Sequence, residues 1–227
     1  IILVGDSLGT TLYGMNNCRN VTLDMMKIHG KAVIKNIKKS ITVVDMPYKS
    51  YTNSEAALKN AKSLLSFTKA NMLKLEINKK NIPLVKYLTS KNINVVSHIG
   101  VTPQSFSDFS KIKAVGRTEK ESNDLLNLAK KSENLGAKII LLECVTQKTA
   151  KKITENVSVP TIGIGSSKYC DGQVLVFDDL IGFDSSKFNP RFVKRYMNFD
   201  KQAKTAVKKF TKDVKRKKFP SKKNSYH

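Results

Sequence analysis

Polar side chains that can do chemistry follow apolar segments at five places in the first 143 residues. They are Asp6 and Ser7, Asp45, Lys74 and Glu76, His98, and Glu143. Carboxylates can hold a hard divalent cation or move protons, and the sequence has no cysteine and histidine cluster that would favour a softer metal. Magnesium takes one or two protein carboxylates and leaves its other positions to water and substrate oxygens. These residue types therefore predict a magnesium site.

A lysine beside such a metal favours a substrate that carries its own carboxylate. Lys74 and Glu76 are two residues apart in a predicted strand, so both side chains point to the same side of the sheet. A bound cation or a charged substrate would compensate for burying them. The combination suits a 2-oxo acid, because a metal that chelates its keto and carboxyl oxygens makes the adjacent carbon acidic. Glu143, a carboxylate not needed for the metal, is the candidate base.

Apolar segments and helical segments alternate along the whole chain. Apolar, β-branched runs predict strands at 1–5, 41–45, 71–76, 93–98, 138–143, 159–164 and 173–178. Helical periodicity predicts helices at 24–37, 56–70, 79–90, 120–135 and 146–156. This alternation is typical of a parallel sheet covered by helices. The polar residues then lie at the carboxyl ends of strands, where barrel enzymes build active sites. Each of these residues also has a purely structural interpretation. Asp6 and Asp45 could each cap the turn after a strand, and His98 could be a histidine of the buried core.

The number of predicted strands, seven, is one fewer than a TIM (β/α)8 barrel needs. We expect one βα unit to be missing upstream of Ile1, so that residues 1–5 form the second strand of such an α/β barrel. The competing fold is an open doubly wound sheet, but no GxGxxG pattern follows the first strand to support it. We predict one barrel domain over residues 1–227, with a basic helical tail at about 200–227.

Basic residues greatly outnumber acidic ones, with 41 Lys and Arg against 18 Asp and Glu and a net charge of +23. Such a balance makes nucleic acid a first candidate partner. However, the basic residues are mostly lysines spread along the chain. Their densest run, 201–223, has few of the arginines and interleaved aromatic residues that phosphate recognition usually brings. A solvated surface is the favoured interpretation, and polyanion binding by the tail stays open as a non-enzymatic alternative.

Targeting and redox signals are weak in this sequence. No apolar run approaches the roughly 18 residues of a membrane span, so no membrane partner is predicted. The three cysteines, Cys18, Cys144 and Cys170, show no CxxC spacing. They predict free thiols in a reducing, cytoplasmic setting, and neither a disulfide framework nor a zinc site.

Seven short motifs follow one another along the chain. They are VGDSLG (4–9), VVDMPYKSY (43–51), LKLE (73–76), HIGVTPQS (98–105), LECV (142–145), VPTIGIG (159–165) and DGQVLV (171–176). Together they resemble the ketopantoate hydroxymethyltransferase family, from Ile1 to the C-terminus. The resemblance implies a TIM barrel of the phosphoenolpyruvate/pyruvate superfamily whose first strand and helix precede the VGDS motif. It also implies a homo-oligomer, often a decamer.

The resemblance assigns the acidic residues to two roles. It implies that Asp6 and Asp45 hold Mg²⁺ and that Glu76 completes the surroundings of the metal. It implies that Glu143 is the general base. The implied reaction joins a one-carbon unit from 5,10-methylenetetrahydrofolate to 3-methyl-2-oxobutanoate and gives 2-dehydropantoate, in pantothenate biosynthesis.

The resemblance also implies which residues bind the oxo acid. Ser7 and Lys74 would join Asp6 and Asp45 in binding it, and His98 lies at a matching active-site position with a supporting role. A second enzymatic hypothesis keeps the barrel and the metal but makes the protein a carbon–carbon lyase or mutase acting on a 2-oxo acid. Such relatives usually carry a catalytic loop with a cysteine, and no matching segment is present.

Overall fold

Seven parallel strands form one sheet in the computed structural model, which describes residues 1–183 and 190–226. The strands pair in chain order: β1 (Ile2–Val4), β2 (Thr42–Asp45), β3 (Met72–Glu76), β4 (Val95–Gly100), β5 (Ile139–Glu143), β6 (Thr161–Ile164) and β7 (Gly172–Gln173). Each of the first six strands is followed by a crossover to its neighbour, as in a barrel wound in one direction. The seven predicted strands are confirmed.

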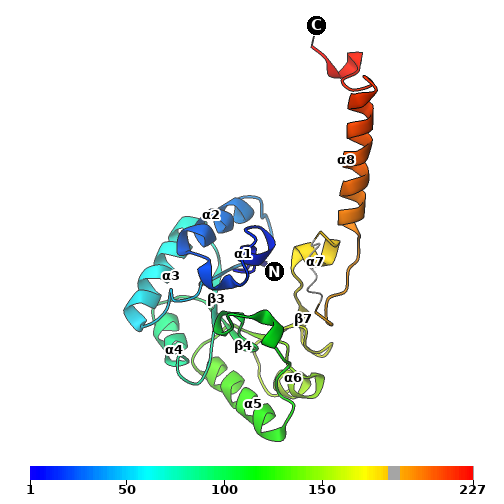
Figure 1. Cartoon of the computed structure of the whole chain (residues 1–227). Helices are drawn as coiled ribbons and strands as arrows, with labels where there is room; N and C mark the ends of the chain where they lie inside the picture. Colours follow the sequence, from blue (N-terminus) through cyan, green and yellow to red (C-terminus); the bar gives the residue numbers. More distant parts are fainter. Residues whose placement is uncertain (184–189, 227) are drawn as a thin grey trace. The chain divides into compact units, whose positions relative to one another are not determined.

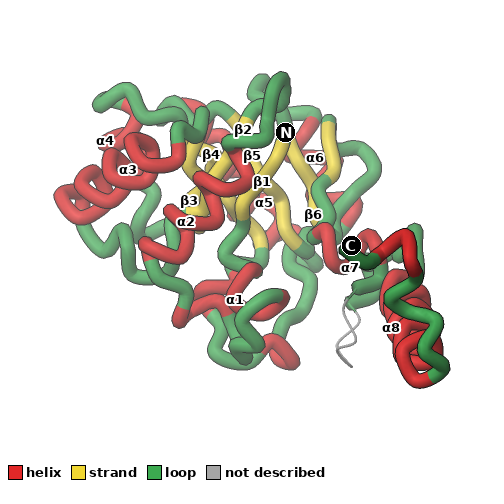
Figure 2. Tube along the Cα trace, turned by 90° about the horizontal axis from the view of Figure 1, so that it is seen from above, coloured by secondary structure: helices red, strands yellow, loops and turns green. Residues whose placement is uncertain are grey.

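Helices lie outside the strands in the unit formed by residues 1–174 (Figure 1, Figure 2). They are α1 (Leu8–Thr11), α2 (Leu23–Ile34), α3 (Ser54–Thr68), α4 (Pro83–Thr89), α5 (Glu119–Asn134) and α6 (Gln147–Thr154). The side chains of Thr22, Asn53 and Thr118 accept backbone hydrogen bonds at the starts of α2, α3 and α5. Such caps satisfy N–H groups that have no partner inside the helix, so the sequence itself fixes where these helices begin.

The two faces of the sheet carry different side chains because residues alternate along a strand. Leu73 and Leu75 of β3 belong to the apolar core between the sheet and its helices. Lys74 and Glu76 alternate with them and therefore lie on the opposite face. That face carries a smaller apolar cluster, formed by Val43, Val96, Ile139 and Leu141. The polar residues at the strand ends thus continue the inner face of the sheet.

The register of the sheet brings the polar strand ends together. Asp45 is paired with Lys74, and Glu76 is paired with His98. On the next pair of strands, Gly100 is opposite Glu143. Polar residues far apart in the sequence are therefore neighbours at one edge of the sheet.

The last strand is shorter than predicted. Residues 173–178 are predicted as a strand, whereas β7 has only two residues and helix α7 (Phe177–Ile181) begins soon after it. The reason is that β7 pairs only with β6 in the described part of the chain, and β6 ends at Ile164. Beyond Val174, whose N–H still donates to Gly163, no strand is available to continue the ladder.

Residues 175–227 form a second unit. In addition to α7, this unit contains α8 (Phe199–Lys215) and a short 3-10 helix, η4 (Lys222–Asn224). The rings of Phe183 and Phe199 are 5.2 Å apart, and those of Phe210 and Phe219 are 5.3 Å apart. The helix α8 lies within the segment expected as a basic tail, of which residue 227 is outside the described residues. No helix of the described residues is long and apolar enough to cross a bilayer.

Candidate active site

A buried ion pair forms the centre of the strand-end cluster. The Nζ atom of Lys74 is 3.0 Å from Oδ2 of Asp45. The same carboxylate oxygen accepts the backbone N–H of Asp6 at 3.0 Å. The other oxygen of Asp45, Oδ1, is buried and has no hydrogen-bond partner among the described residues. One strong acceptor is therefore left for a ligand that the protein does not itself supply.

His98 connects this pair to Glu143. Its Nδ1 is 3.3 Å from Nζ of Lys74, and its Nε2 is 3.2 Å from Oε2 of Glu143. The second contact is short enough for a hydrogen bond but not aligned for one, and Nε2 has no hydrogen-bond partner among the described residues. Burial and the charge of Lys74 lower the pKa of His98, so the ring is neutral near pH 7. With Lys74 donating to Nδ1, the ring proton lies on Nε2 and faces Glu143.

Gln104 joins two of the acidic residues. It lies in a 3-10 helix, η2 (Pro103–Ser105), and its side-chain Nε2 donates to Oδ2 of Asp6 at 2.7 Å. Its backbone N–H donates to both carboxylate oxygens of Glu76, each at 3.1 Å. The hydroxyl of Tyr51 donates to the side-chain oxygen of Gln104. Sequence reasoning missed both Gln104 and Tyr51, although each lies in a motif singled out there.

Burial dominates the electrostatics of the acidic residues. It raises the pKa of Asp6 to about 7, and the Asp45 carboxylate adds to the shift. Burial also raises the pKa of Glu76 well above its ordinary value. Burial alone would lower the pKa of Lys74, but the Asp45 and Asp6 carboxylates more than offset this and keep the lysine charged. The cluster holds more carboxyl groups than cations, and a divalent cation would supply the missing charge.

The donor set fits magnesium through two residues. No three acidic, histidine or cysteine side chains of the described residues are gathered as a preformed metal site. Magnesium does not need one, because it binds through one or two carboxylates and keeps several waters. Asp6 and Asp45 are adjacent, and Asp45 has an oxygen without a partner. Glu76 is a weaker candidate ligand than Asp45, because both of its oxygens share the N–H of Gln104, whereas Asp45 has an oxygen without a partner in the described part of the chain.

Ser7 and Glu143 lie at the open side of the cluster. The place where a Cβ on Gly5 would stand is 3.2 Å from Oγ of Ser7 and 3.5 Å from Oδ2 of Asp45. A side chain at position 5 would therefore crowd the hydroxyl of Ser7. The side chain of Glu143 is 18% exposed, whereas that of His98 is 1% exposed. Glu143 can therefore reach a molecule that enters from solvent.

Comparison with known proteins identifies the family to which the chain belongs. The sequence profile described as Ketopantoate hydroxymethyltransferase matches residues 1–222. The 3-methyl-2-oxobutanoate hydroxymethyltransferase of Pelagibacter ubique (strain HTCC1062) is 51% identical over 226 residues, which are 100% of this chain and 86% of that protein. The chain belongs to the ketopantoate hydroxymethyltransferase family. A Helicobacter pylori (strain Shi470) enzyme of the same name is 41% identical over 227 residues, 100% of this chain and 84% of its own length.

Membership of the ketopantoate hydroxymethyltransferase family confirms the predicted class of enzyme, a hydroxymethyltransferase of pantothenate biosynthesis. A solved structure of 2,3-dimethylmalate lyase, a PEP mutase/isocitrate lyase superfamily member, has a TM-score of 0.56 with 11% identity. That comparison covers 98% of this chain and 75% of the lyase. It supports the predicted TIM-type fold of this ketopantoate hydroxymethyltransferase family member. At that identity it carries no information about the reaction.

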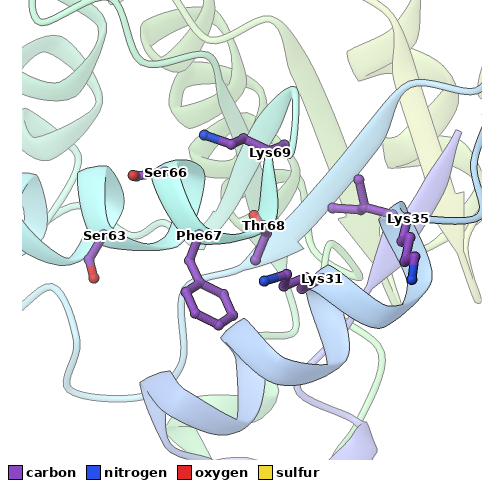
Figure 3. Close-up of a pocket in the computed structure, with 8 residues that line it drawn as sticks. Lys31, Lys35, Ser63, Ser66, Phe67, Thr68 and Lys69 are labelled. Carbon is purple, nitrogen blue, oxygen red and sulfur yellow. The ribbon is translucent and has the colours of Figure 1, made fainter.

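A surface pocket of about 650 Å³ lies apart from the active site of this family member (Figure 3). It is lined by Lys31, Ile34, Lys35, Ser63, Ser66, Phe67, Thr68 and Lys69, none of which belongs to the strand-end cluster. These residues come from the last turns of α2 and α3 and the segments that follow them. The lysines of this pocket complement the partial negative charge of the two helix C-termini, so their presence there does not require a bound ligand.

Proposed function

We propose that this chain transfers a hydroxymethyl group from 5,10-methylenetetrahydrofolate to 3-methyl-2-oxobutanoate, giving 2-dehydropantoate. The observation that carries the proposal is the buried arrangement of Asp6, Asp45 and Lys74, with Glu143 beside them at the open edge. It combines two metal-binding carboxylates, a fixed positive charge and a separate carboxylate. A 2-oxo acid offers a complementary set of oxygens and an acidic carbon.

Binding of the oxo acid is assigned to four side chains. Asp6 and Asp45 would hold Mg²⁺, with Glu76 acting through water. When bound, the metal supplies positive charge that stabilises negative charge developing on the substrate oxygens. Lys74 stays protonated and can pair with the substrate carboxylate, and the hydroxyl of Ser7 can donate to it.

Glu143 is assigned the proton transfer. The C–H bond at C3 of the oxo acid breaks, and the proton goes to the carboxylate of Glu143. The electron pair of C3 forms the new bond to the one-carbon unit, whose two C–N bonds to the folate break. A water molecule supplies the hydroxyl oxygen, and its remaining proton and the one taken up by Glu143 go to the two nitrogens of tetrahydrofolate. The neutral ring of His98 lies beside Glu143, with its Nε2 3.2 Å from Oε2 of the carboxylate, and the protonated Nε2 adds no second base there. The partial exposure of Glu143 fits a group that must meet a second substrate arriving from solvent.

The proposal is tested with purified protein, both substrates and Mg²⁺, measuring 2-dehydropantoate. In a second assay, NMR follows loss of the C3 proton of the oxo acid in D₂O without folate. Glu143→Gln should lower both rates by about 10²–10⁴-fold, the range expected for a lost general base. Glu155→Gln, at a surface carboxylate 3.6 Å from Lys151, is the matched control. No turnover by the parent protein refutes the function, and unchanged exchange in Glu143→Gln refutes the assignment of the base.

A further inference from the structure

Gln104 lies where polar groups from three strand ends meet. It is 4% exposed and follows β4, and it contacts residues that follow or end β1, β2 and β3. We propose that Gln104 is a positioning residue that orients Asp6 toward the divalent cation. This inference rests on the proposed function, because the divalent cation is part of that proposal.

The side-chain amide of Gln104 fixes one oxygen of Asp6. Its Nε2 donates to Oδ2 of Asp6 at 2.7 Å and to the backbone oxygen of Met46 at 3.0 Å, which uses both of its N–H bonds. With Oδ2 held in this way, Asp6 presents its other oxygen. Asp45 likewise has Oδ2 engaged by Lys74 and Oδ1 without a partner among the described residues. Each aspartate thus keeps one oxygen that these contacts do not use.

The backbone of Gln104 acts on Glu76 in a different way. One N–H donor is shared equally between both carboxylate oxygens, at 3.1 Å from each. The donor therefore occupies the side on which both oxygens could together grip a cation. A grip on a cation through both oxygens of Glu76 is therefore blocked on that side, while the charge of Glu76 still contributes to the site. A single residue thus gives Asp6 and Glu76 unequal roles.

The hydroxyl of Tyr51 supports the orientation of the Gln104 amide. This hydroxyl donates to the side-chain oxygen of Gln104, so Nε2 is directed toward Asp6 and Met46. The flipped amide would place its oxygen against two other acceptors, which is unfavourable in a buried site. Loss of the Tyr51 hydroxyl therefore weakens the preference for the orientation that holds Asp6.

Three variants separate positioning from general stability. Gln104→Met removes the amide but keeps the length of the side chain and the backbone N–H. Tyr51→Phe removes only the hydroxyl that orients the amide. Tyr48→Phe is the matched control, since it removes a hydroxyl from the same segment that contacts Arg19 and not Gln104. If Gln104→Met does not fold, Tyr51→Phe decides the result.

The measurement is the affinity for Mn²⁺, an EPR-visible substitute for Mg²⁺, followed by kcat at saturating Mn²⁺. For Gln104→Met we expect a Kd about 10- to 100-fold higher, as is typical when the partner of a metal ligand is lost. For Tyr51→Phe we expect a rise of about 2- to 12-fold, the equivalent of one hydrogen bond. In both variants saturating Mn²⁺ should restore most of kcat. Tyr48→Phe should leave the Kd unchanged.

The outcomes distinguish this inference from the proposed function. If Tyr51→Phe and Tyr48→Phe give the same Kd for Mn²⁺, the positioning role is refuted and the transfer reaction is unaffected. A lower melting temperature with unchanged Kd also refutes it, because it would show a merely structural contact. A parent protein that binds Mn²⁺ with the expected ranking of variants, but makes no 2-dehydropantoate, supports the positioning role and refutes the reaction.

Discussion

Replacement of Lys74 by Met tests the charge balance of the active site most directly. The side chains of Lys74 and Asp45 are 7% and 3% exposed, and their charged atoms are 3.0 Å apart. Removing one partner of a buried ion pair leaves the other charge unpaired, at a cost of about 3–5 kcal/mol. Because 1 kcal/mol shifts the melting temperature of a domain of this size by roughly 2–4 °C, the expected fall is about 6–20 °C.

A second ion pair in the chain provides a matched control. Nζ of Lys79 is 2.9 Å from Oδ1 of Asp124, almost the same separation, but these side chains are 70% and 44% exposed. Exposed pairs contribute at most about 1 kcal/mol, because water and salt screen them. Lys79→Met should therefore change the melting temperature far less than Lys74→Met. Because the two ion pairs have almost the same separation, the comparison measures the effect of burial on the energy of the pair.

Urea unfolding monitored by circular dichroism gives the free energies, and a double variant completes the test. Asp45→Asn combined with Lys74→Met removes both charges, so its loss should be smaller than the sum of the two single losses by about 0.5–3 kcal/mol. Additive losses, or equal effects of Lys74→Met and Lys79→Met, would refute the view that Lys74 neutralises a buried carboxylate.

Two further predictions concern the backbone and the metal. Gly100→Ala should destabilise the protein more than Gly14→Ala, because at Gly100 (φ +100°) a Cβ would lie 2.5 Å from the backbone oxygen of Glu143, whereas at Gly14 (φ +63°) it meets nothing within 4 Å. Equal melting temperatures for the two variants would contradict the predicted clash. Treatment with EDTA should abolish formation of 2-dehydropantoate, and Mg²⁺ should restore it, because the proposed ligands Asp6 and Asp45 carry the carboxylates that this ion prefers. Full activity after metal removal would rule out their metal-binding role.

The sequence by itself determined the class of the fold and the edge of the sheet at which the polar residues gather. Alternating apolar strands and helices predicted the parallel sheet, and the polar residues after each strand predicted the edge at which they meet. The two-residue spacing of Lys74 and Glu76 placed both on the inner face, where they are found. These features depend on local periodicity, which the chain carries without reference to distant segments.

The tertiary structure alone decided how the polar residues divide their roles. Gln104 is 98 residues from Asp6 and 28 from Glu76 in the sequence, so its contacts with them follow from sheet register and loop conformation. The contact of Lys74 with His98 depends in the same way on the pairing of β3 with β4. The length of β7 was mispredicted because pairing with β6, and not local propensity, sets where it ends. Burial, which shifts the pKa of Asp6 to about 7, likewise exists only once these segments have come together.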